Sequence, residues 1–206
     1  MSFPNKSYEC LSDFADEYFF QYVQSSKEIS HNKLQQAAEV LIATYKAGNT
    51  VYICGNGGSA AISNHFVCDH LKGIQADTAV RPRVISLSSN IETITAIAND
   101  IDYADIYVFQ LRTLARENDC LITISSSGDS ENVFRALEWG GKNNLKSISM
   151  TGFDGGRSAN LADINLHVGG DNYGIIEDLH QSIMHILAQY LRLVEMDEGI
   201  IADKKF

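Results

Sequence analysis

From residue 50 onward, short apolar runs rich in β-branched residues alternate with longer segments of helical periodicity. This alternation constrains the fold more than any other feature of the sequence. The runs are Thr50–Cys54, Arg83–Leu87, Cys120–Ser125, Lys146–Thr151 and Ile164–Val168. Each is mostly apolar along its length, as expected for strands covered on both faces, and the segments between them are long enough for crossover helices. We therefore expect an α/β fold with a doubly wound parallel sheet of about five strands.

The residues before this alternation predict two helices. Apolar residues recur at helical spacing in the first of them, at Leu11, Phe14, Tyr18, Phe19 and Tyr22. In the second, Asn32 is the expected N-cap, Gln35 completes a capping-box pattern, and Gly48 ends the helix. The α/β part therefore carries an N-terminal helical extension.

The chain shows no linker or low-complexity stretch, so we expect a single domain over residues 1–206. Within it, residues 1–48 would form the N-terminal helices, and residues 49–196 would form the α/β core with its final helix. That helix is predicted from Gly174 to about Glu195. The tail from Glu198 to Phe206 is expected to be a frayed terminus.

The formal net charge of −10 argues against a general binder of nucleic acid or of anionic membranes. It does not exclude a small anionic ligand in a local pocket. The first residues lack the apolar segment of a secretory signal, and no apolar run approaches the roughly 18 residues of a membrane span. Four scattered cysteines are typical of single thiols in a reducing compartment, which predicts the cytoplasm.

A glycine-rich loop follows the first predicted strand, with the sequence G-N-G-G-S-A-A over residues 55–61. Its glycines allow a sharp turn that exposes backbone N–H groups beside the N-terminus of the next helix. Taken alone, such a turn is sometimes only a tight connection. It is neither a Walker A loop nor a dinucleotide-binding motif, because Ala60 stands where the third glycine of that motif would be.

A serine-rich loop, S-S-S-G-D-S-E-N over residues 125–132, follows the third predicted strand and again leads into a helix. Its four hydroxyls and the helix N-terminus would form a phosphate site that needs no lysine or arginine. The alternative is that Ser130 or Asp129 only caps the helix. Three consecutive serines exceed what a cap requires, so the loop favours phosphate binding.

Two predicted helices carry candidate acid–base or metal-binding residues. His65 and Asp69 are four residues apart, while Glu177, Gln181 and His185 share one face of the last helix. Two histidines and two carboxylates that converge from two helices would suit Zn²⁺ or a similar divalent ion. A His–Asp pair at this spacing is more often a surface ion pair. The nearby His180 has a similarly plain alternative, packing against a helix.

These residues together resemble the sugar isomerase (SIS) domain and, more narrowly, the sedoheptulose 7-phosphate isomerase (phosphoheptose isomerase) family. The resemblance rests on the two loops above and spans about residues 30–193. Further agreement is found in L-S-S-N at 87–90, A-I-A-N-D at 96–100, T-G at 151–152, D-G-G-R at 154–157 and the final helix. It implies a homotetramer with active sites between subunits, in which the N-terminal helices of residues 1–48 serve assembly.

The resemblance also implies site residues. The phosphate would be surrounded by Ser59, Ser125, Ser126, Ser127 and Ser130. The remaining substrate-binding positions would be Asn56, Gly57, Gly58, Asn99, Asp100 and Glu177. The metal ligands, for Zn²⁺ or a similar ion, would be His65, Asp69, Glu177 and His185.

Three positions depart from the family pattern. Asp69 replaces a glutamate, Glu177 replaces a glutamine, and Gly73 stands where the family often has an arginine. The metal set would therefore carry more negative charge, and the candidate base would have a shorter reach. The family's usual product has the manno configuration, and these changes leave an altro product open.

The expected reaction converts sedoheptulose 7-phosphate to a D-glycero-D-heptose 7-phosphate through an enediol. Asp69 would be the general base and His185 the general acid. Two alternatives stay open: an isomerase of another sugar phosphate, and a non-catalytic scaffold or sensor that binds a replication initiator. The second class tends to lose the histidine and the carboxylate of the last helix, which this chain retains.

Overall fold

A computed structural model describes residues 3–206, which form one parallel sheet with helices on both faces. The strands are β1 (Thr50–Gly55), β2 (Arg83–Ser86), β3 (Cys120–Ser125), β4 (Lys146–Thr151) and β5 (Ile164–His167). Their order across the sheet is β2-β1-β3-β4-β5, and all neighbours are parallel. Each strand begins and ends within a residue of its predicted range, so the α/β class is confirmed. Among the five strands, exposed or partly exposed positions occur only in the edge strands β2 and β5 and at Lys146, the first residue of β4.

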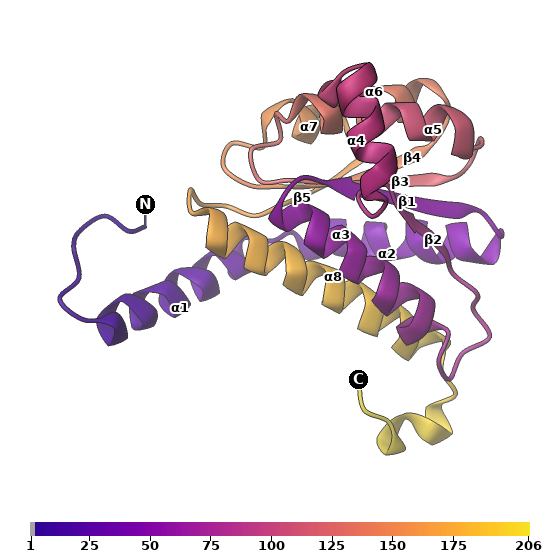
Figure 1. Ribbon diagram of the computed structural model, residues 1–206. Helices are drawn as coiled ribbons and strands as arrows, with labels where there is room; N and C mark the ends of the chain where they lie inside the picture. Colours follow the sequence, from indigo (N-terminus) through magenta and orange to yellow (C-terminus); the bar gives the residue numbers. More distant parts are fainter. Residues whose placement is uncertain (1–2) are drawn as a thin grey trace.

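The helices form one layer on each side of the sheet (Figure 1). One layer contains α2 (His31–Lys46), α3 (Gly58–Cys68) and α8 (Tyr173–Glu195). The other contains α4 (Ile91–Asp100), α5 (Val108–Leu114), α6 (Glu131–Lys142) and α7 (Gly156–Leu161). A hydrophobic cluster lies under each layer: Leu41, Phe66 and Ile183 belong to the larger one, and Leu87, Leu111 and Val133 belong to the smaller one.

Strand order places the loops after β1 and β3 next to each other. The chain moves from β1 outward to β2 on one side and then crosses to β3 on the other side of β1. Ligands of such sheets bind at this reversal, beyond the carboxyl ends of the strands. The glycine-rich and serine-rich loops both lie there.

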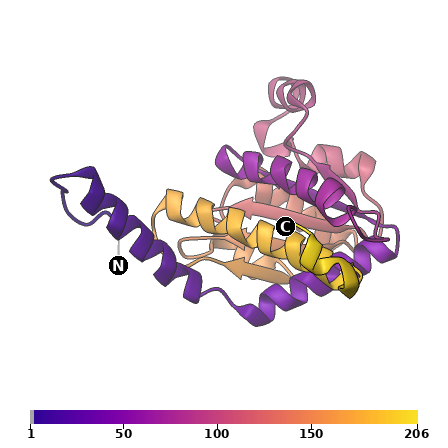
Figure 2. The same ribbon diagram turned by 90° about the horizontal axis from the view of Figure 1, so that it is seen from below.

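The first helix, α1 (Leu11–Lys27), projects from the rest of the chain (Figure 2). None of its side chains is buried, whereas α2 contributes Ala37, Ala38 and Leu41 to the core. Two tyrosine hydroxyls hold α1 to α8, since Tyr18 donates to Asp178 and Tyr22 bonds with Ser182, each at 2.6 Å. Phe14, Tyr18 and Tyr22 of α1 are only partly buried where they pack against the core.

The N-cap of α2 differs from the prediction. Ser30, not Asn32, caps the helix and accepts a hydrogen bond from the Lys33 amide at 3.3 Å. Gln35 donates to Glu39 at 2.9 Å instead of completing a capping box. The helix begins at His31, so Asn32 already lies inside its first turn. Ser30 occupies the N-cap position, and its hydroxyl accepts from a free backbone amide of that turn.

The C-terminal tail is also not frayed, as had been expected. Residues Glu198–Asp203 form the short 3-10 helix η3, which follows α8. The tail is held by Asp77, whose carboxylate accepts from Arg192 at 2.8 Å and from Lys204 at 2.6 Å. The partner that orders the tail is more than a hundred residues away in the sequence, so local composition gave no sign of it. Within residues 3–206, every helix is too short or too polar to cross a membrane.

Candidate active site

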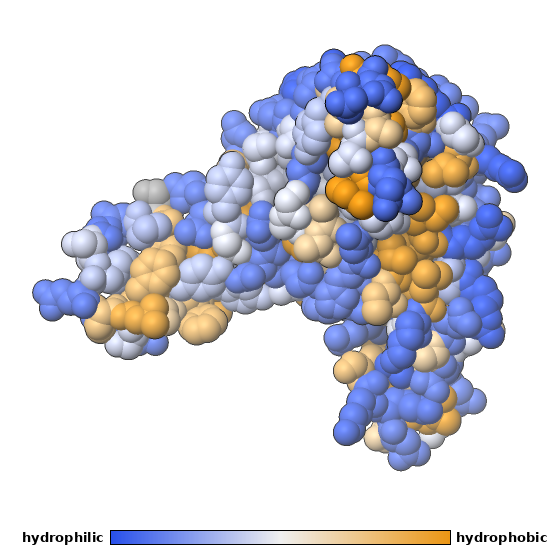
Figure 3. Space-filling model, in the orientation of Figure 1, coloured by the Kyte–Doolittle hydropathy of each residue, from blue (hydrophilic) through white to orange (hydrophobic). Residues whose placement is uncertain are grey.

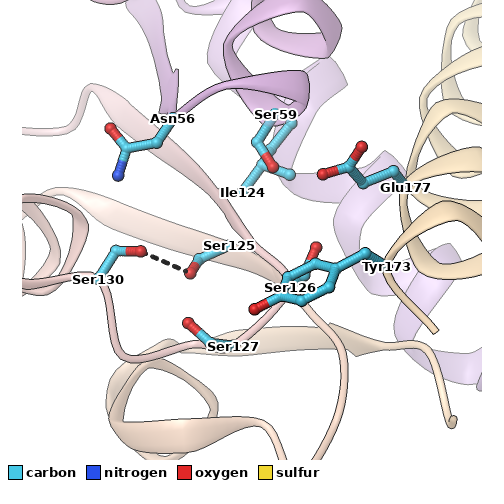
Figure 4. Close-up of a pocket in the computed structure, with 9 residues that line it drawn as sticks. All are labelled: Asn56, Ser59, Ile124, Ser125, Ser126, Ser127, Ser130, Tyr173 and Glu177. Carbon is cyan, nitrogen blue, oxygen red and sulfur yellow. Dashed lines mark hydrogen bonds between the residues drawn. The ribbon is translucent and has the colours of Figure 1, made fainter. Parts of the chain in front are cut away.

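The candidate site begins with a small polar pocket at the reversal of strand order (Figure 4). Its volume is about 150 Å³. The lining residues come from three segments: Asn56 and Ser59 after β1, Ile124, Ser125, Ser126, Ser127 and Ser130 around the end of β3, and Tyr173 and Glu177 on α8. The two loops singled out by the sequence therefore form one pocket, together with a wall from the last helix.

Close approach of the backbone to α8 explains the glycine pair in the first loop. Gly57 has a φ of +53° and precedes the N-terminus of α3. A Cβ atom at Gly58 would overlap the carboxylate end of the Glu177 side chain, which would then have to move away. Because α3 begins at Gly58 and Ser59 lines the pocket, the N-terminus of this helix lies beside the pocket, where it favours an anion.

The serine-rich loop presents hydroxyls to the same pocket. Ser125 donates to Ser130 at 3.3 Å and accepts from the Gly128 amide at 3.1 Å. The hydroxyl of Ser126 is buried without a hydrogen-bond partner among residues 3–206. Ser130 is the N-cap residue of α6, but its hydroxyl makes no capping hydrogen bond within the described chain. Capping thus does not account for the serines.

Asn56 fixes the side of the pocket nearest α6. Its amide exchanges two hydrogen bonds with Asn132, at 2.9 and 3.0 Å, and its oxygen also accepts from Tyr107 at 3.0 Å. A half-buried amide with this many partners keeps one orientation. The pocket is therefore preformed on this side.

A second group of polar residues lies where α3 meets α8. Asp69 begins a π-helical segment, η1 (Asp69–Ile74), directly after α3. Its Oδ1 lies 3.3 Å from Nε2 of His65, and its Oδ2 lies 2.9 Å from Nδ1 of His185. One carboxylate thus joins two histidines from two helices, whereas the sequence analysis had expected two carboxylates in this group.

The donor set of this triad fits a divalent metal ion. One ligand atom from each of His65, Asp69 and His185 can be chosen so that all lie within 4.8 Å of one another. Two ligands of a tetrahedral zinc ion, at about 2.0–2.2 Å from it, are separated by roughly 3.3 Å. Small movements of these side chains would bring three such ligands to one ion.

Some predicted residues lie elsewhere. Glu177 lines the serine pocket and does not belong to the triad, although it was predicted to be both a substrate-binding residue and a metal ligand. Asn99 donates to Asp100 at 2.7 Å, and both side chains are exposed on α4. Among the described residues, neither of these two lines the pocket.

His180 lies near the site but has a structural role. It is fully buried, and its Nε2 donates to the carbonyl oxygen of Thr151 at 3.2 Å. Burial lowers the pKa of His180 to about 4, so the ring stays neutral. It packs the helix against the sheet and takes no part in the triad.

Two residues at the site had been given no role from the sequence. Tyr173, the first residue of α8, lines the pocket, and no sequence pattern marks it. The side-chain amide nitrogen of Gln181 lies 3.1 Å from Nδ1 of His65 and 3.0 Å from Nε2 of His185. Helical spacing had already placed Gln181 on the same face of α8 as His185, but spacing gave it no partner on α3.

The parallel sheet, with a polar pocket at the reversal of its strand order, has the fold of a sugar isomerase domain. The SIS domain family matches residues 17–152 of the chain. Phosphoheptose isomerases are similar over most of their length: that of Helicobacter pylori is 36% identical over 172 residues, which cover 80% of this chain and 85% of the relative. That of Colwellia psychrerythraea is 32% identical over 178 residues, which cover 85% and 90%.

A solved structure shows the same relationship. The phosphoheptose isomerase of Francisella tularensis superposes with a TM-score of 0.81 at 30% sequence identity, covering 89% of this chain and 99% of that chain. The phosphoheptose isomerase of Neisseria gonorrhoeae gives the same TM-score at 26% identity. The chain belongs to the phosphoheptose isomerase family.

Proposed function

We propose that this protein is an aldose–ketose isomerase that converts sedoheptulose 7-phosphate to a D-glycero-D-heptose 7-phosphate. One observation carries the proposal: a serine-lined pocket and a His–Asp–His group lie along the same helix, α8. Glu177 faces the pocket and His185 belongs to the triad, eight residues further on. At 1.5 Å per residue this separation is about 12 Å, which suits a long sugar phosphate held at both ends.

The phosphate would bind in the serine pocket. Ser59, Ser125, Ser126, Ser127 and Ser130 supply hydroxyl donors, and the amides after Gly57 and Gly58 supply backbone donors. The free buried hydroxyl of Ser126 supports this role, because buried polar groups normally have a partner. A phosphate oxygen would provide it.

Asp69 and His185 would move the protons. The carboxylate of Asp69 removes a proton from C1 of the ketose, the C1–C2 double bond forms, and the C2 carbonyl oxygen receives a proton from His185. His185 then takes the proton from the hydroxyl at C1, the C1 carbonyl forms, and Asp69 returns its proton to C2. The atoms balance, and the 2.9 Å contact between the two side chains keeps acid and base adjacent.

His65, Asp69 and His185 would hold a divalent metal ion, with Zn²⁺ as the proposed ion. When bound, such an ion polarises the substrate oxygens and stabilises the negative charge of the enediolate. Glu177 would serve as a fourth ligand only if its side chain turns from the serine pocket. Its present position supports the substrate-binding role instead.

We further propose a homo-oligomer, a homotetramer by family resemblance, with active sites between subunits. The projecting α1 exposes Leu11, Phe19, Phe20 and Val23, and Figure 3 shows apolar atoms along this projecting part. Asn99 and Asp100 would contact sugar only if a second copy presents them to its neighbour's site. The cytoplasm is proposed on the strength of the four free thiols.

The test is an assay of the zinc-loaded protein with sedoheptulose 7-phosphate, with the product identified by NMR in D₂O. A heptose 7-phosphate is expected, with deuterium at C2 to the extent that the proton on Asp69 exchanges with D₂O before it returns to the sugar, and NMR also separates manno from altro products. Faster turnover of a pentulose or hexulose phosphate would assign another sugar phosphate. Binding without any turnover would overturn the proposal in favour of a non-catalytic sensor.

A further inference from the structure

Gln181 closes a ring of hydrogen bonds around the candidate metal site. Starting from Asp69, the contacts run from Oδ1 to Nε2 of His65 at 3.3 Å and from Nδ1 of His65 to the Gln181 amide at 3.1 Å. They continue from the amide to Nε2 of His185 at 3.0 Å and from Nδ1 of His185 back to Oδ2 of Asp69 at 2.9 Å. Each imidazole therefore has one nitrogen facing Asp69 and the other facing Gln181.

Counting donors and acceptors fixes where the protons lie in this ring. A carboxylate only accepts, and a neutral imidazole carries one N–H and one lone pair. Both histidines therefore donate to Asp69, through Nε2 of His65 and Nδ1 of His185. The nitrogens that face Gln181 are then acceptors, and the amide NH₂ has one hydrogen for each of them. Every polar hydrogen in the ring has a partner.

A divalent cation on the Asp69 side reverses this pattern. The nitrogens facing Asp69 must then offer lone pairs, so each N–H moves to the nitrogen facing Gln181. The amide can meet this change by turning over, because its oxygen has two lone pairs and accepts both N–H groups. Glutamine is thus complementary to the ring with and without the ion. A methionine at this position could hydrogen-bond with the two ring nitrogens in neither state. A glutamate could accept both N–H groups, but only in the metal-bound state.

We propose that Gln181 is a positioning residue that sets the tautomers of His65 and His185 and turns its amide when a divalent cation binds. The inference rests on the metal site of the proposed function. It adds to that proposal a residue outside the set of metal ligands. Its place on α8, one turn before His185 and within reach of His65 from α3, lets a single amide orient both rings.

The first test measures Zn²⁺ affinity by competition with a chromophoric chelator at about pH 8, where free imidazole is neutral. Loss of an outer-shell partner typically weakens metal binding about 10–100-fold, which we expect for Gln181→Met. Gln181→Glu should bind Zn²⁺ at least as tightly as the unaltered protein. Gln35→Met removes an exposed helix amide on α2 and serves as the matched control, with unchanged affinity expected.

The second test reads the tautomers by long-range ¹H–¹⁵N correlation of the imidazole rings. Without metal, the proton of His65 should be on Nε2 and that of His185 on Nδ1; with Zn²⁺, both should move to the other nitrogen. A Gln181→Met protein that keeps wild-type Zn²⁺ affinity, or unchanged tautomers on zinc loading, would overturn the inference. Thermal melts of each variant verify folding.

The two proposals fail separately. If the protein isomerises a heptulose phosphate but Gln181→Met binds Zn²⁺ normally, Gln181 has no positioning role and the proposed function stands. If no sugar phosphate is turned over but Zn²⁺ binding depends on Gln181, the positioning role stands and the proposed function does not.

Discussion

Oδ2 of Asp69 lies 2.9 Å from Nδ1 of His185, although 116 residues separate them in the sequence. The contact depends on two local features. Asp69 begins the π-helical turn η1, and His185 lies in the middle of α8, which packs on α3 and η1. A π-helical turn is uncommon and is found frequently at functional sites. The backbone around Asp69 thus orients its carboxylate toward the last helix.

Replacing this carboxylate should abolish most of the activity. We expect Asp69→Asn to lower kcat about 10²–10⁴-fold, because an amide cannot accept the proton of C1. Asp69→Glu restores the carboxylate with one more methylene, and we expect it to retain much more activity than the amide. The measurement is a steady-state assay with sedoheptulose 7-phosphate.

Asp16→Asn, at an exposed position of α1, is the matched control for the loss of one charge. Its turnover should equal that of the unaltered protein. Near-normal turnover by Asp69→Asn would show that another group takes the proton.

The buried hydroxyl of Ser126 should matter to phosphate binding and not to folding. A hydrogen bond to a charged group contributes about 1.5–3 kcal/mol, so Ser126→Ala should raise KM for the sugar phosphate roughly 10–150-fold. The melting temperature should not fall, because within residues 3–206 this hydroxyl bonds to nothing. KM and thermal melting are measured on the same samples.

Ser158→Ala is a close control, since its hydroxyl is also buried without a partner in the described chain but lies on α7, outside the pocket. Its KM should not change. Equal KM values for the two variants would remove Ser126 from the phosphate site.

The sheet could be predicted because its strands are short runs rich in β-branched and other apolar residues, and the segments between them are long enough to return the chain. Ser125 to Ser127 and Gly57 to Gly58 were recognisable for a similar reason: hydroxyls and glycines concentrate where a backbone approaches an anion. The sheet and the two loops both depend on the properties of residues that follow one another in the chain, and a sequence shows such properties directly.

What the sequence could not predict depends on contacts between distant segments. The direction of Glu177 follows from the close approach of α8 to Gly58, and the order of the tail follows from Asp77. The role of Gln181 requires His65 from another helix. Helical spacing identified the shared face of α8 but could not divide it between pocket and triad.

Acidification should destabilise the fold through two buried histidines. Burial lowers the pKa of His70 to about 3 and that of His180 to about 4. The unfolded chain binds protons at these rings near pH 6.5, whereas the folded chain does not, so the stability present above about pH 6.5 is lost as pH falls toward the folded values. The loss is about 1.4 kcal/mol per pH unit for each histidine.

Urea unfolding at several pH values between about 7 and 5 measures this slope. His70→Gln removes one of the two protonation sites and should flatten the slope, while substitution of the exposed His31 by glutamine should not. An unchanged slope in His70→Gln would mean that this ring is already protonated in the folded protein.

The ordered structure of the C-terminal tail should depend on Asp77. Its φ of +64° suits asparagine, so Asp77→Asn removes the charge without straining the backbone. We expect faster hydrogen exchange of the amides in Glu198–Asp203 and little change in the melting temperature, because exposed ion pairs contribute weakly to global stability. High salt should have the same effect on the unaltered protein. Unchanged protection in both cases would show that the tail is held by its apolar contacts instead.

Assembly should depend on the apolar side of α1. Phe19 is 66% exposed there, and we expect Phe19→Glu to lower the molar mass measured by light scattering, because a charge would be buried in the interface. Ser12→Glu adds the same charge to an exposed polar position of α1 and should leave the mass unchanged. If turnover falls together with the mass, the active sites lie between subunits. If the mass falls and turnover persists, the serine pocket and the triad of a single chain suffice, and the interfacial site is ruled out.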